Sequence, residues 1–553
     1  MRYLGLAAPA VLDCLNKGSD DEEDFVMMRW QLAWRTVCHT SVALACSTFA
    51  LVACKSGDKS ETIDSGVETS AINGDAPTWY QDIAPIVTPK CSGCHQDGGI
   101  APFSMETYES AKIFAAQMAD AVETGRMPPF LAQDTDECTP RLPWKNDLRL
   151  NDEEKATLRA WADAKAPEGD PKKAVKTATP QAAKLEREDV IMKVPEEFVI
   201  DGVEDLHRCV VVDTKLDHDA VMIGSLITSG NPAVLHHVVS YIVQPGTNDD
   251  GTDRTKAQLE AAIKADKGVG IGEYYDCFGG PGLQNASFQV LDAWAPGGVP
   301  NMAPENAGMP IDKDALVILD MHYHPTGAGV EKDSKTKLSL MTTDTQPKWI
   351  SRIVLLGNFE EPRETPAGTG KLLKQKGETK PEFLIPAGEK HHVEEMTWTW
   401  DFSNSSFGAV DFRVIGLGTH MHYVGRDMLV TLEHGDESEN PGDKECLIQT
   451  PSWDFNWQRG YTYDAPREDL PVMGQGDVLR LRCTYDNSVN NRFVAEALDA
   501  QGLKKPVDVP LGENTLDEMC LIGIGIMYPN VNAGKTIGNE KADAGVSDAD
   551  ASQ

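Results

Sequence analysis

Six of the 13 histidines lie in three short apolar segments, at His236-His237, at His322 and His324, and at His420 and His422. Residues i and i+2 of a strand share a face, so His420 and His422 can hold one metal ion side by side. His236 and His237 should point to opposite faces unless a bulge or a strand end turns one of them. Each histidine alone could be a hydrogen-bonded core residue, but three clusters on apolar strands indicate metal binding. Imidazole suits zinc, copper or iron, and an added thioether would favour copper, especially Cu(I).

A second constellation is the C-x-x-C-H motif of Cys91, Cys94 and His95. Two thiols at this spacing can add to the vinyl groups of haem while the histidine binds the iron. Met127, which precedes two prolines, is the candidate sixth ligand, and thioether ligation suits electron transfer. The alternatives are a redox-active dithiol, which normally follows a strand, and half of a zinc site, which lacks two further local ligands. We therefore expect one haem c.

Helical patterns surround this motif. Apolar residues recur at helical spacing over Tyr108–Val122, and a second helix is expected over Asp152–Ala164 with Asn151 as its N-cap. Residues 150–161 resemble the terminal helix of small bacterial cytochromes c. This resemblance covers residues 78–168 and implies a small all-α cytochrome c-like domain.

Residues 169–187 carry Pro, Lys and Thr without apolar periodicity, which indicates a linker. Short β-type runs separated by turn residues follow it, at Val210–Val212, Val234–Val243, Ala315–His324, Val414–His422, Met428–Leu432 and Val478–Tyr485. This pattern predicts antiparallel β-sandwiches. The expected fold class is therefore multidomain, with a small helical domain followed by β-sandwich domains.

The first 54 residues are expected to be a misplaced start followed by a lipoprotein signal peptide. A start at Met27 or Met28 gives a basic patch, an apolar run over Ser41–Ala53 and then Leu-Val-Ala-Cys54. That tetrapeptide resembles a bacterial lipobox, which implies lipid attachment to Cys54; an uncleaved anchor is the alternative. Residues 55–77 would form a flexible tether. Residues 531–553 are small and acidic and are expected to be a disordered tail.

The net charge of −35 argues against nucleic-acid binding, because phosphate contacts require clustered Lys and Arg. No later stretch is long and apolar enough to span a bilayer. We therefore expect an exported protein that is held to a bacterial membrane by its lipid alone. The expected membrane is the outer membrane, with the protein facing the periplasm or the cell surface. Six further cysteines in an oxidising compartment indicate disulfides, with 15 possible connectivities. They are Cys138, Cys209, Cys277, Cys446, Cys483 and Cys520.

Taken in order, the histidine segments resemble the type II copper, ascorbate-dependent monooxygenases, the family of dopamine β-hydroxylase and peptidylglycine α-hydroxylating monooxygenase. The resemblance covers about residues 188–530, as two jelly-roll-like copper domains over 188–348 and 349–530. It implies two copper sites, whose ligands are His236, His237 and His322 in the first, and His420, His422 and Met519 in the second. The segment around Cys483 resembles the one whose cysteine bridges to the cysteine after that methionine, which implies a Cys483–Cys520 disulfide.

The resemblance implies an enzyme, a copper-dependent monooxygenase that hydroxylates a C–H bond of a small organic substrate with O2. Two copper ions and one haem c per chain are expected, with two electrons per turnover from ascorbate or a redox protein. The haem would feed the copper of the first site. The alternative is an extracytoplasmic copper and haem electron-transfer or copper-binding protein without oxygenase activity. A binding module that has lost its metals is disfavoured by six intact ligands.

The chain departs from the peptide-acting branch of this family. Gly418 stands where that branch has an arginine, and Leu521 and Gly523 stand where it has Asn and Tyr. Recognition of a peptide carboxylate is therefore not expected. Asp320 could contact a cationic amine, although a partnered surface carboxylate is the commoner case. His324 is left out of the ligand set, and His391-His392 is expected to be an exposed pair in a polar turn.

Overall fold

The computed structural model describes residues 76–97, 99, 101–176, 184–195, 197–202, 206–248, 251–277, 280–296, 298–327, 329–365, 367–403, 412–438, 440–512 and 516–537. Cys54, the expected signal peptide and residues 55–75 lie outside this set, as do residues 538–553 of the expected tail. Among the described residues, no helix is both long enough and apolar enough to cross a membrane.

Residues 76–174 contain a group of short helices with a core of their own. The helices are η1 (Trp79–Ile83), α1 (Ala84–Lys90), α2 (Tyr108–Ala111), η2 (Lys112–Phe114), α3 (Ala115–Glu123), α4 (Asp152–Asp163) and η3 (Pro171–Lys173). Asn151 caps α4 as predicted: its side chain accepts the Glu154 N–H, and the Glu154 carboxylate accepts the Asn151 N–H. Trp79 and Trp161 pack in this core with ring centroids 5.8 Å apart. The cytochrome c-like assignment of these helices stays a prediction.

The first part of the β region is a two-layered structure. Its elements are β1 (Val190–Lys193), β2 (Phe198–Ile200), β3 (Leu206–Asp213), β4 (Ala220–Thr228), β5 (Leu235–Val243), α5 (Lys256–Lys267), β6 (Tyr274–Asp276), β7 (Phe288–Trp294), β8 (Asn301–Met302), β9 (Ala307–Ile311), β10 (Leu316–Tyr323), β11 (Glu331–Asp333) and β12 (Lys337–Thr343). The order β1-β12-β4-β9 runs through one layer and β7-β5-β10-β3-β6 through the other. Val317 of β10 and Leu338 of β12 belong to the core between them. Leu259 and Ile263 of α5 pack against the opposite face of β10, so this strand is buried on both sides.

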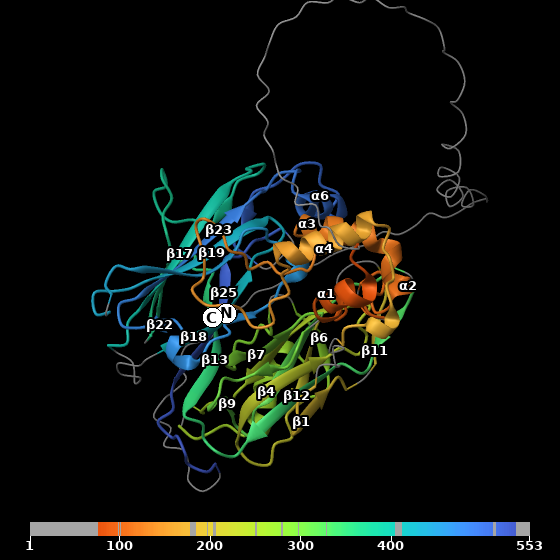
Figure 1. The fold of residues 1–553 in the computed structure, drawn as a ribbon. Helices are drawn as coiled ribbons and strands as arrows, with labels where there is room; N and C mark the ends of the chain where they lie inside the picture. Colours follow the sequence, from red (N-terminus) through yellow and green to blue (C-terminus); the bar gives the residue numbers. More distant parts are fainter. Residues whose placement is uncertain are drawn as a thin grey trace, which may run out of the picture. The chain divides into compact units, whose positions relative to one another are not determined.

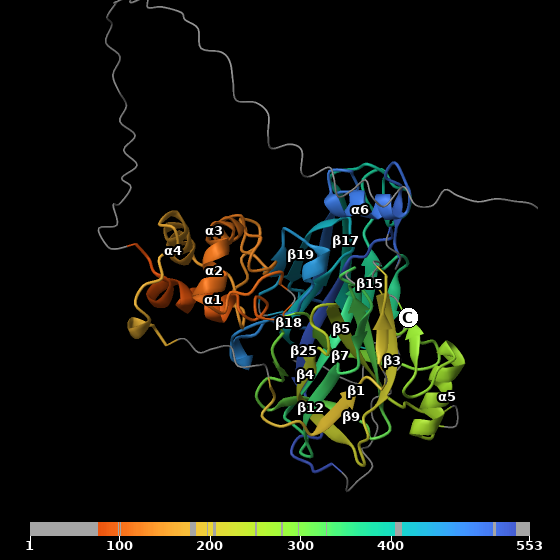
Figure 2. The ribbon, with the colours of Figure 1, turned by 90° about the vertical axis from the view of Figure 1, so that its right-hand side faces the viewer.

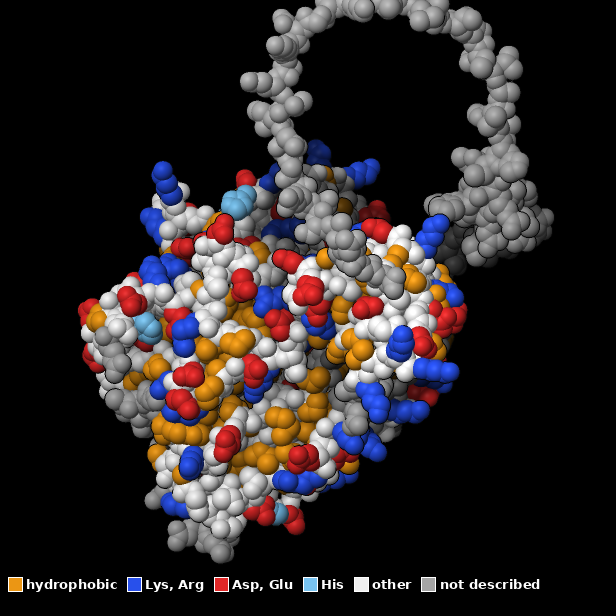
Figure 3. All heavy atoms as spheres, viewed as in Figure 1, with side chains coloured by type: hydrophobic (Ala, Val, Ile, Leu, Met, Phe, Trp, Pro, Cys, Tyr) orange, Lys and Arg blue, Asp and Glu red, His pale blue; other side chains and the backbone are white. Residues whose placement is uncertain are grey.

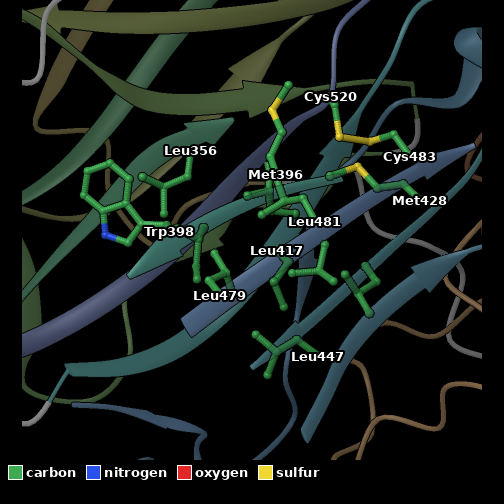
Figure 4. Close-up of a cluster of buried hydrophobic side chains, with 14 of the residues drawn as sticks. Leu356, Met396, Trp398, Leu417, Met428, Leu447, Leu479, Leu481, Cys483 and Cys520 are labelled. Atoms are coloured by element: carbon green, nitrogen blue, oxygen red, sulfur yellow. A yellow bond between two sulfur atoms is a disulfide. The ribbon is translucent and has the colours of Figure 1, made fainter. Parts of the chain in front are cut away.

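The second part of the β region is also a sandwich. Its elements are β13 (Trp349–Gly357), β14 (Arg363–Thr365), β15 (Gly368–Leu372), β16 (Leu384–Ile385), β17 (His392–Trp400), β18 (Phe412–His420), β19 (Gly425–Glu433), β20 (Lys444–Thr450), η4 (Phe455–Trp457), β21 (Tyr461–Thr462), η5 (Arg467–Asp469), β22 (Val472–Met473), β23 (Val478–Tyr485), α6 (Arg492–Ala500), β24 (Val509–Pro510) and β25 (Leu521–Pro529). A six-stranded sheet, β14-β15-β17-β23-β19-β20, packs on β13, β25 and β18. Figure 4 shows the sulfur-rich core between them, where Met396 and Met428 lie beside the Cys483–Cys520 disulfide.

Strand β13 joins the two parts of the β region. It pairs with β25 along its whole length, with β9 through two parallel pairs, and with β7 through Ile353 and Val290. Backbone hydrogen bonding is therefore continuous from β1 to β25, and β13 begins at Trp349, the first residue of the second predicted copper domain. In Figures 1 and 2, β4, β9 and β12 are grouped apart from β17 and β19. The chain is thus rich in β-sheet and divided into several cores, as its sequence predicts.

Apolar side chains also reach the surface of the β region. Figure 3 shows them gathered over the middle of the face on which β13 and β7 are labelled in Figure 1, with charged side chains around them. Leu355 of β13 and Met302 of β8 are among the exposed apolar residues. The outer face of the joining strand is therefore partly apolar.

All six predicted disulfide cysteines are paired. The bonds are Cys138–Cys446, Cys209–Cys277 and Cys483–Cys520, and the last is the pair implied by the family resemblance. Cys138 lies within 78–168, the expected cytochrome c-like domain, and Cys446 lies on β20, within the expected second copper domain. The Cys138–Cys446 bond therefore joins two parts that the sequence assigned to different domains. Three disulfides fit an extracytoplasmic protein, because such bonds persist in oxidising compartments.

We predict that non-reducing peptide mapping recovers these three pairs. Joint replacement of Cys138 and Cys446 by Ala should lower the free energy of unfolding of the unit that contains β20 by about 2–4 kcal/mol, because the bond closes a long loop. Urea denaturation followed by tryptophan fluorescence measures this change. The matched Cys209→Ala/Cys277→Ala variant should instead weaken the core of α5 and β3. A peptide that links Cys138 to any other cysteine would contradict the assignment.

Candidate metal centres and haem attachment site

The first candidate centre is built on three adjacent antiparallel strands. His322 of β10 is paired with His237 of β5 on one side and with His207 of β3 on the other. Residues paired directly across antiparallel strands lie on the same face of the sheet. The register therefore places three imidazoles in a row on one face.

A β-bulge adds the fourth imidazole. His322 is paired with His237, but the next residue, Tyr323, is paired with Leu235, so His236 is the extra residue of β5. A bulge turns its extra residue out of the normal alternation of faces. The neighbouring histidines, which an uninterrupted strand would point to opposite faces, can therefore act together.

The side-chain nitrogens of this centre fit a metal ion. The Nδ1 atoms of His236, His237 and His322 lie 3.2, 3.3 and 3.3 Å from one another. Nitrogens with this spacing suit an ion that binds each of them at about 2.0–2.1 Å in tetrahedral directions. Desolvation, followed by the neighbouring histidines, lowers the pKa of His237 well below its ordinary value, which keeps the imidazole neutral. Neutral imidazoles are the form that binds metal.

The second candidate centre lies at the end of β18. His420 is the last residue of this strand, and its ring lies 5.2 Å from that of His422, measured between centroids. His420 is paired with Leu521, the first residue of β25, and Met519 stands two residues before Leu521. Met519 is buried. The register thus brings the predicted thioether to the strand end that carries the two histidines.

Hydrogen bonds orient both histidines of the second centre. The Nδ1–H of His420 donates to Oε1 of Gln458 at 2.6 Å, and the Nδ1–H of His422 donates to the Asp517 carbonyl at 3.1 Å. In each ring this assigns the metal-binding lone pair to Nε2. Burial lowers the pKa of His420, and burial followed by His420 lowers the pKa of His422 to about 3. Both rings are therefore neutral at neutral pH.

A buried carboxylate ties the ligand segments of the second centre together. Glu518 accepts N–H groups from His422, from Val424 at 3.1 Å and from Met519 at 2.7 Å. Burial raises the pKa of Glu518 to about 8, and these backbone donors oppose that rise. The Tyr485 hydroxyl also donates to the Met519 carbonyl at 2.8 Å. The histidine turn and the methionine are thus fixed to one group.

The two centres are close enough to interact electrostatically. His420 is one of the groups that lower the pKa of His237, and His207 is one of those that lower the pKa of His422. The ring of His207 stacks on that of His322, with centroids 4.2 Å apart and planes 9° apart. His207 therefore belongs to the site, although the sequence shows it as a single histidine without a neighbouring partner. Only the cross-strand register of β3 and β10 reveals it.

The C-x-x-C-H residues lie after helix α1 in the helical part of the chain. Cys91 and Cys94 are the cysteines without a disulfide among the residues that the structure describes. The buried His95 donates its Nδ1–H to the Phe103 carbonyl at 3.0 Å, which leaves Nε2 as its ligand atom. Burial, followed by Cys94, raises the pKa of Cys91 to about 12. This direction is opposite to that of a redox-active dithiol, in which one thiol has a lowered pKa.

Met127 follows the turn that ends α3. The amide of Met127 donates to the Ala121 carbonyl at 3.1 Å, and the amide of Arg126 donates to the same oxygen at 2.9 Å. Met127 is half-buried, and Pro128 begins the segment that leads to the second β-sandwich. Its role as sixth iron ligand stays a prediction.

Three histidines outside the ligand sets differ in their surroundings. His324 is exposed, and so is His391, for which exposure was expected. The expectation for His392 is wrong, because it is half-buried on β17 with Nε2 2.7 Å from a carboxylate oxygen of Glu394. Glu394 is fully buried, so His392 is held as part of the β17 framework.

Asp320 is a buried residue, contrary to the surface partner expected from its type. It lies two residues before His322 on β10, and its Oδ1 is 3.5 Å from Sγ of Cys277. Burial raises the pKa of Asp320 to about 7. Asp320, Cys209 and Cys277 lie close enough to hold an ion, but the two sulfurs are joined in a disulfide.

Neither a family model nor a curated protein matches this chain. Among solved structures, a protein from Parabacteroides distasonis described as a candidate secreted protein is similar at 9% identity over 63% of this chain and 86% of its own. The TM-score of that alignment is 0.14, which carries no argument about fold or function.

We predict that Gln458→Ala weakens copper binding at the second centre by about 10–100-fold, because the His420 ring loses the acceptor that orients it. Competition titration with a copper chelator measures this affinity. Gln475→Ala is the matched control, since Gln475 makes comparable hydrogen bonds to Asp401 and Phe402. Equal loss of affinity in both variants would contradict a specific role for Gln458.

We predict that His207→Phe retains copper at the first centre, because a flat ring still stacks on His322. His207→Ala removes that support and should weaken the first centre by about tenfold or more. Copper content after dialysis against graded chelator separates the two variants. Equal loss in His207→Phe would show that a nitrogen of His207, rather than its ring, is required.

Proposed function

We propose that the chain is a copper-dependent monooxygenase of the type II, ascorbate-dependent kind, which hydroxylates a C–H bond of a small organic substrate. The observation that carries the proposal is the pairing of two different donor sets. One set offers three Nδ1 atoms within 3.3 Å of one another, and the other offers two Nε2 atoms at a strand end that also carries a buried methionine.

The two donor sets suit different tasks. The first set, His236, His237 and His322, consists of imidazoles only and would store an electron. In the second set, Met519 adds a soft thioether to His420 and His422 and favours Cu(I), the state that binds O2. With copper bound, such a site places one oxygen atom in the product and releases the other as water, at a cost of two external electrons. Glu518 and Gln458 hold these ligands in place throughout.

The helical part of the chain supplies the second predicted cofactor. Cys91 and Cys94 would bind one haem c covalently, with His95 Nε2 and Met127 as axial ligands. Electrons would come from ascorbate or from a redox protein outside the membrane. Export and a lipid anchor at Cys54 complete the proposal, and the three disulfides support an extracytoplasmic location.

Metal analysis of the purified mature chain tests the proposal first. We expect about two copper ions and one iron per chain, and oxygen uptake when ascorbate and a substrate are supplied. Iron without copper, or zinc at the histidines, would contradict the monooxygenase assignment. Two copper ions without any oxygen uptake over a broad substrate panel would favour the alternative, a copper and haem electron-transfer protein.

A pair of methionine variants sharpens the test. Met519→Leu should abolish oxygen uptake while the first copper and the haem remain, because it removes the thioether at nearly constant volume. Met421→Leu is the matched control, since Met421 is also buried but belongs to the apolar core. Each exchange should cost less than about 1.5 kcal/mol of stability. Equal activity of the two variants would exclude Met519 as a ligand.

A further inference from the structure

The segment that follows Met127 leaves the helices and enters the core of the second β-sandwich. Four of its residues belong to that core: Phe130, Leu131, Ala132 and Trp144. The Cys138–Cys446 disulfide fixes the segment to β20, and Thr135 Oγ1 donates to Gln449 Oε1 of the same strand at 2.6 Å. The part of the chain that carries the haem motif is thus joined to the sandwich that holds the second centre.

Aromatic rings line this junction. Phe130 lies edge-on to Tyr461 with centroids 5.0 Å apart, and the Tyr461 hydroxyl accepts the Leu131 N–H at 2.9 Å. Trp144 stacks on Tyr463 at 4.7 Å. Tyr461 lies on β21, which pairs with β18, the strand that ends at His420. Ring contacts therefore lead from the haem side to the strand of the second centre.

Arg459 lies at the centre of the junction. Its guanidinium lies 5.3 Å from the ring centroid of Phe130 and 5.7 Å from that of Tyr461. The backbone of the same residue lies over β18, since its carbonyl is 3.7 Å from the position of a Cβ built on Gly418. Arg459 thus contacts both the aromatic pair and the strand that carries His420.

The preceding residue, Gln458, extends these contacts to the second centre. The Gln458 side chain accepts the Nδ1–H of His420 at 2.6 Å, and Gln458 is joined to Arg459 by a peptide bond. The first centre is built instead on β5, β10 and β3 of the other sandwich. The packing of the haem-bearing part therefore favours one of the two centres.

We propose that Phe130, Arg459, Tyr461 and Gln458 form the electron-transfer contact between the haem module and the His420/His422/Met519 centre. The inference rests on the proposed function, because it requires haem and copper at the predicted residues. In each step one electron leaves the haem iron, which passes from ferrous to ferric, and one arrives at copper, which passes from cupric to cuprous. Ascorbate or another external reductant restores the ferrous haem. The expected delivery to the first centre is replaced by delivery to the second.

Anaerobic flash reduction of the full mature chain tests the route without substrate or turnover. A photoexcited flavin reduces the haem. The haem absorption band then reports haem reoxidation, and the cupric EPR signal reports the arrival of the electron at copper. In His236→Ala/His237→Ala, which removes the first centre, haem reoxidation should persist at its original rate. In His420→Ala/His422→Ala it should be lost. The opposite pattern would overturn the proposal.

Variants of the contact test its residues. Phe130→Leu and Arg459→Met should slow haem reoxidation severalfold, and Phe130→Tyr should restore the rate because the ring is kept. Arg467→Met is the matched control, since Arg467 stacks on Trp349 at 3.6 Å in the same sandwich. Unchanged rates in Phe130→Leu and Arg459→Met would overturn the proposed contact. Copper and iron are measured on the same samples. A chain without copper would overturn the proposed function, whereas a chain with copper and iron but unchanged reoxidation rates would overturn only the proposed electron-transfer contact.

Discussion

The antiparallel register of β5, β10 and β3 is the constraint on which the first centre depends. Two pairings of His322 place imidazoles on one face, and one extra residue in β5 adds His236. Burial of β10 on both sides fixes this register, because a slip of one residue would turn its apolar side chains out of two cores at once. The geometry of the histidine cluster is therefore maintained by apolar packing that extends far beyond the cluster.

The second centre depends on a different device, a buried carboxylate. Glu518 binds backbone amides of both ligand segments, and the adjacent Cys483–Cys520 disulfide fixes Met519 against β23. A buried polar group costs free energy unless it is fully hydrogen-bonded, so this arrangement tolerates little movement. His420 ends strand β18, whereas His422 and Met519 lie outside the strands, so the Glu518 hydrogen bonds and the disulfide hold the part of this candidate centre that no strand fixes. Strand β13 links the two sandwiches, so neither centre is independent of the other.

The strands that carry the histidines could be predicted because apolar runs and turn residues are local features of the sequence. The bulge at His236 could not, since it arises from a length mismatch between two strands. His207 and Gln458 escaped notice for a related reason: each reaches the site through a pairing or loop that joins residues distant in the sequence. The Cys483–Cys520 pair followed from a resemblance, whereas Cys138–Cys446 had to await the packing of residues 128–150 on β20.

That packing changes how the helical part must work. A module held only by the linker at 169–187 could swing and visit both centres in turn. The disulfide to β20 and the insertion of Phe130 and Trp144 into the second core remove that freedom. A haem bound as proposed would therefore be held beside contacts that lead to Gln458 and His420. Under that proposal, an electron for the first centre would arrive through the second centre or directly from an external donor.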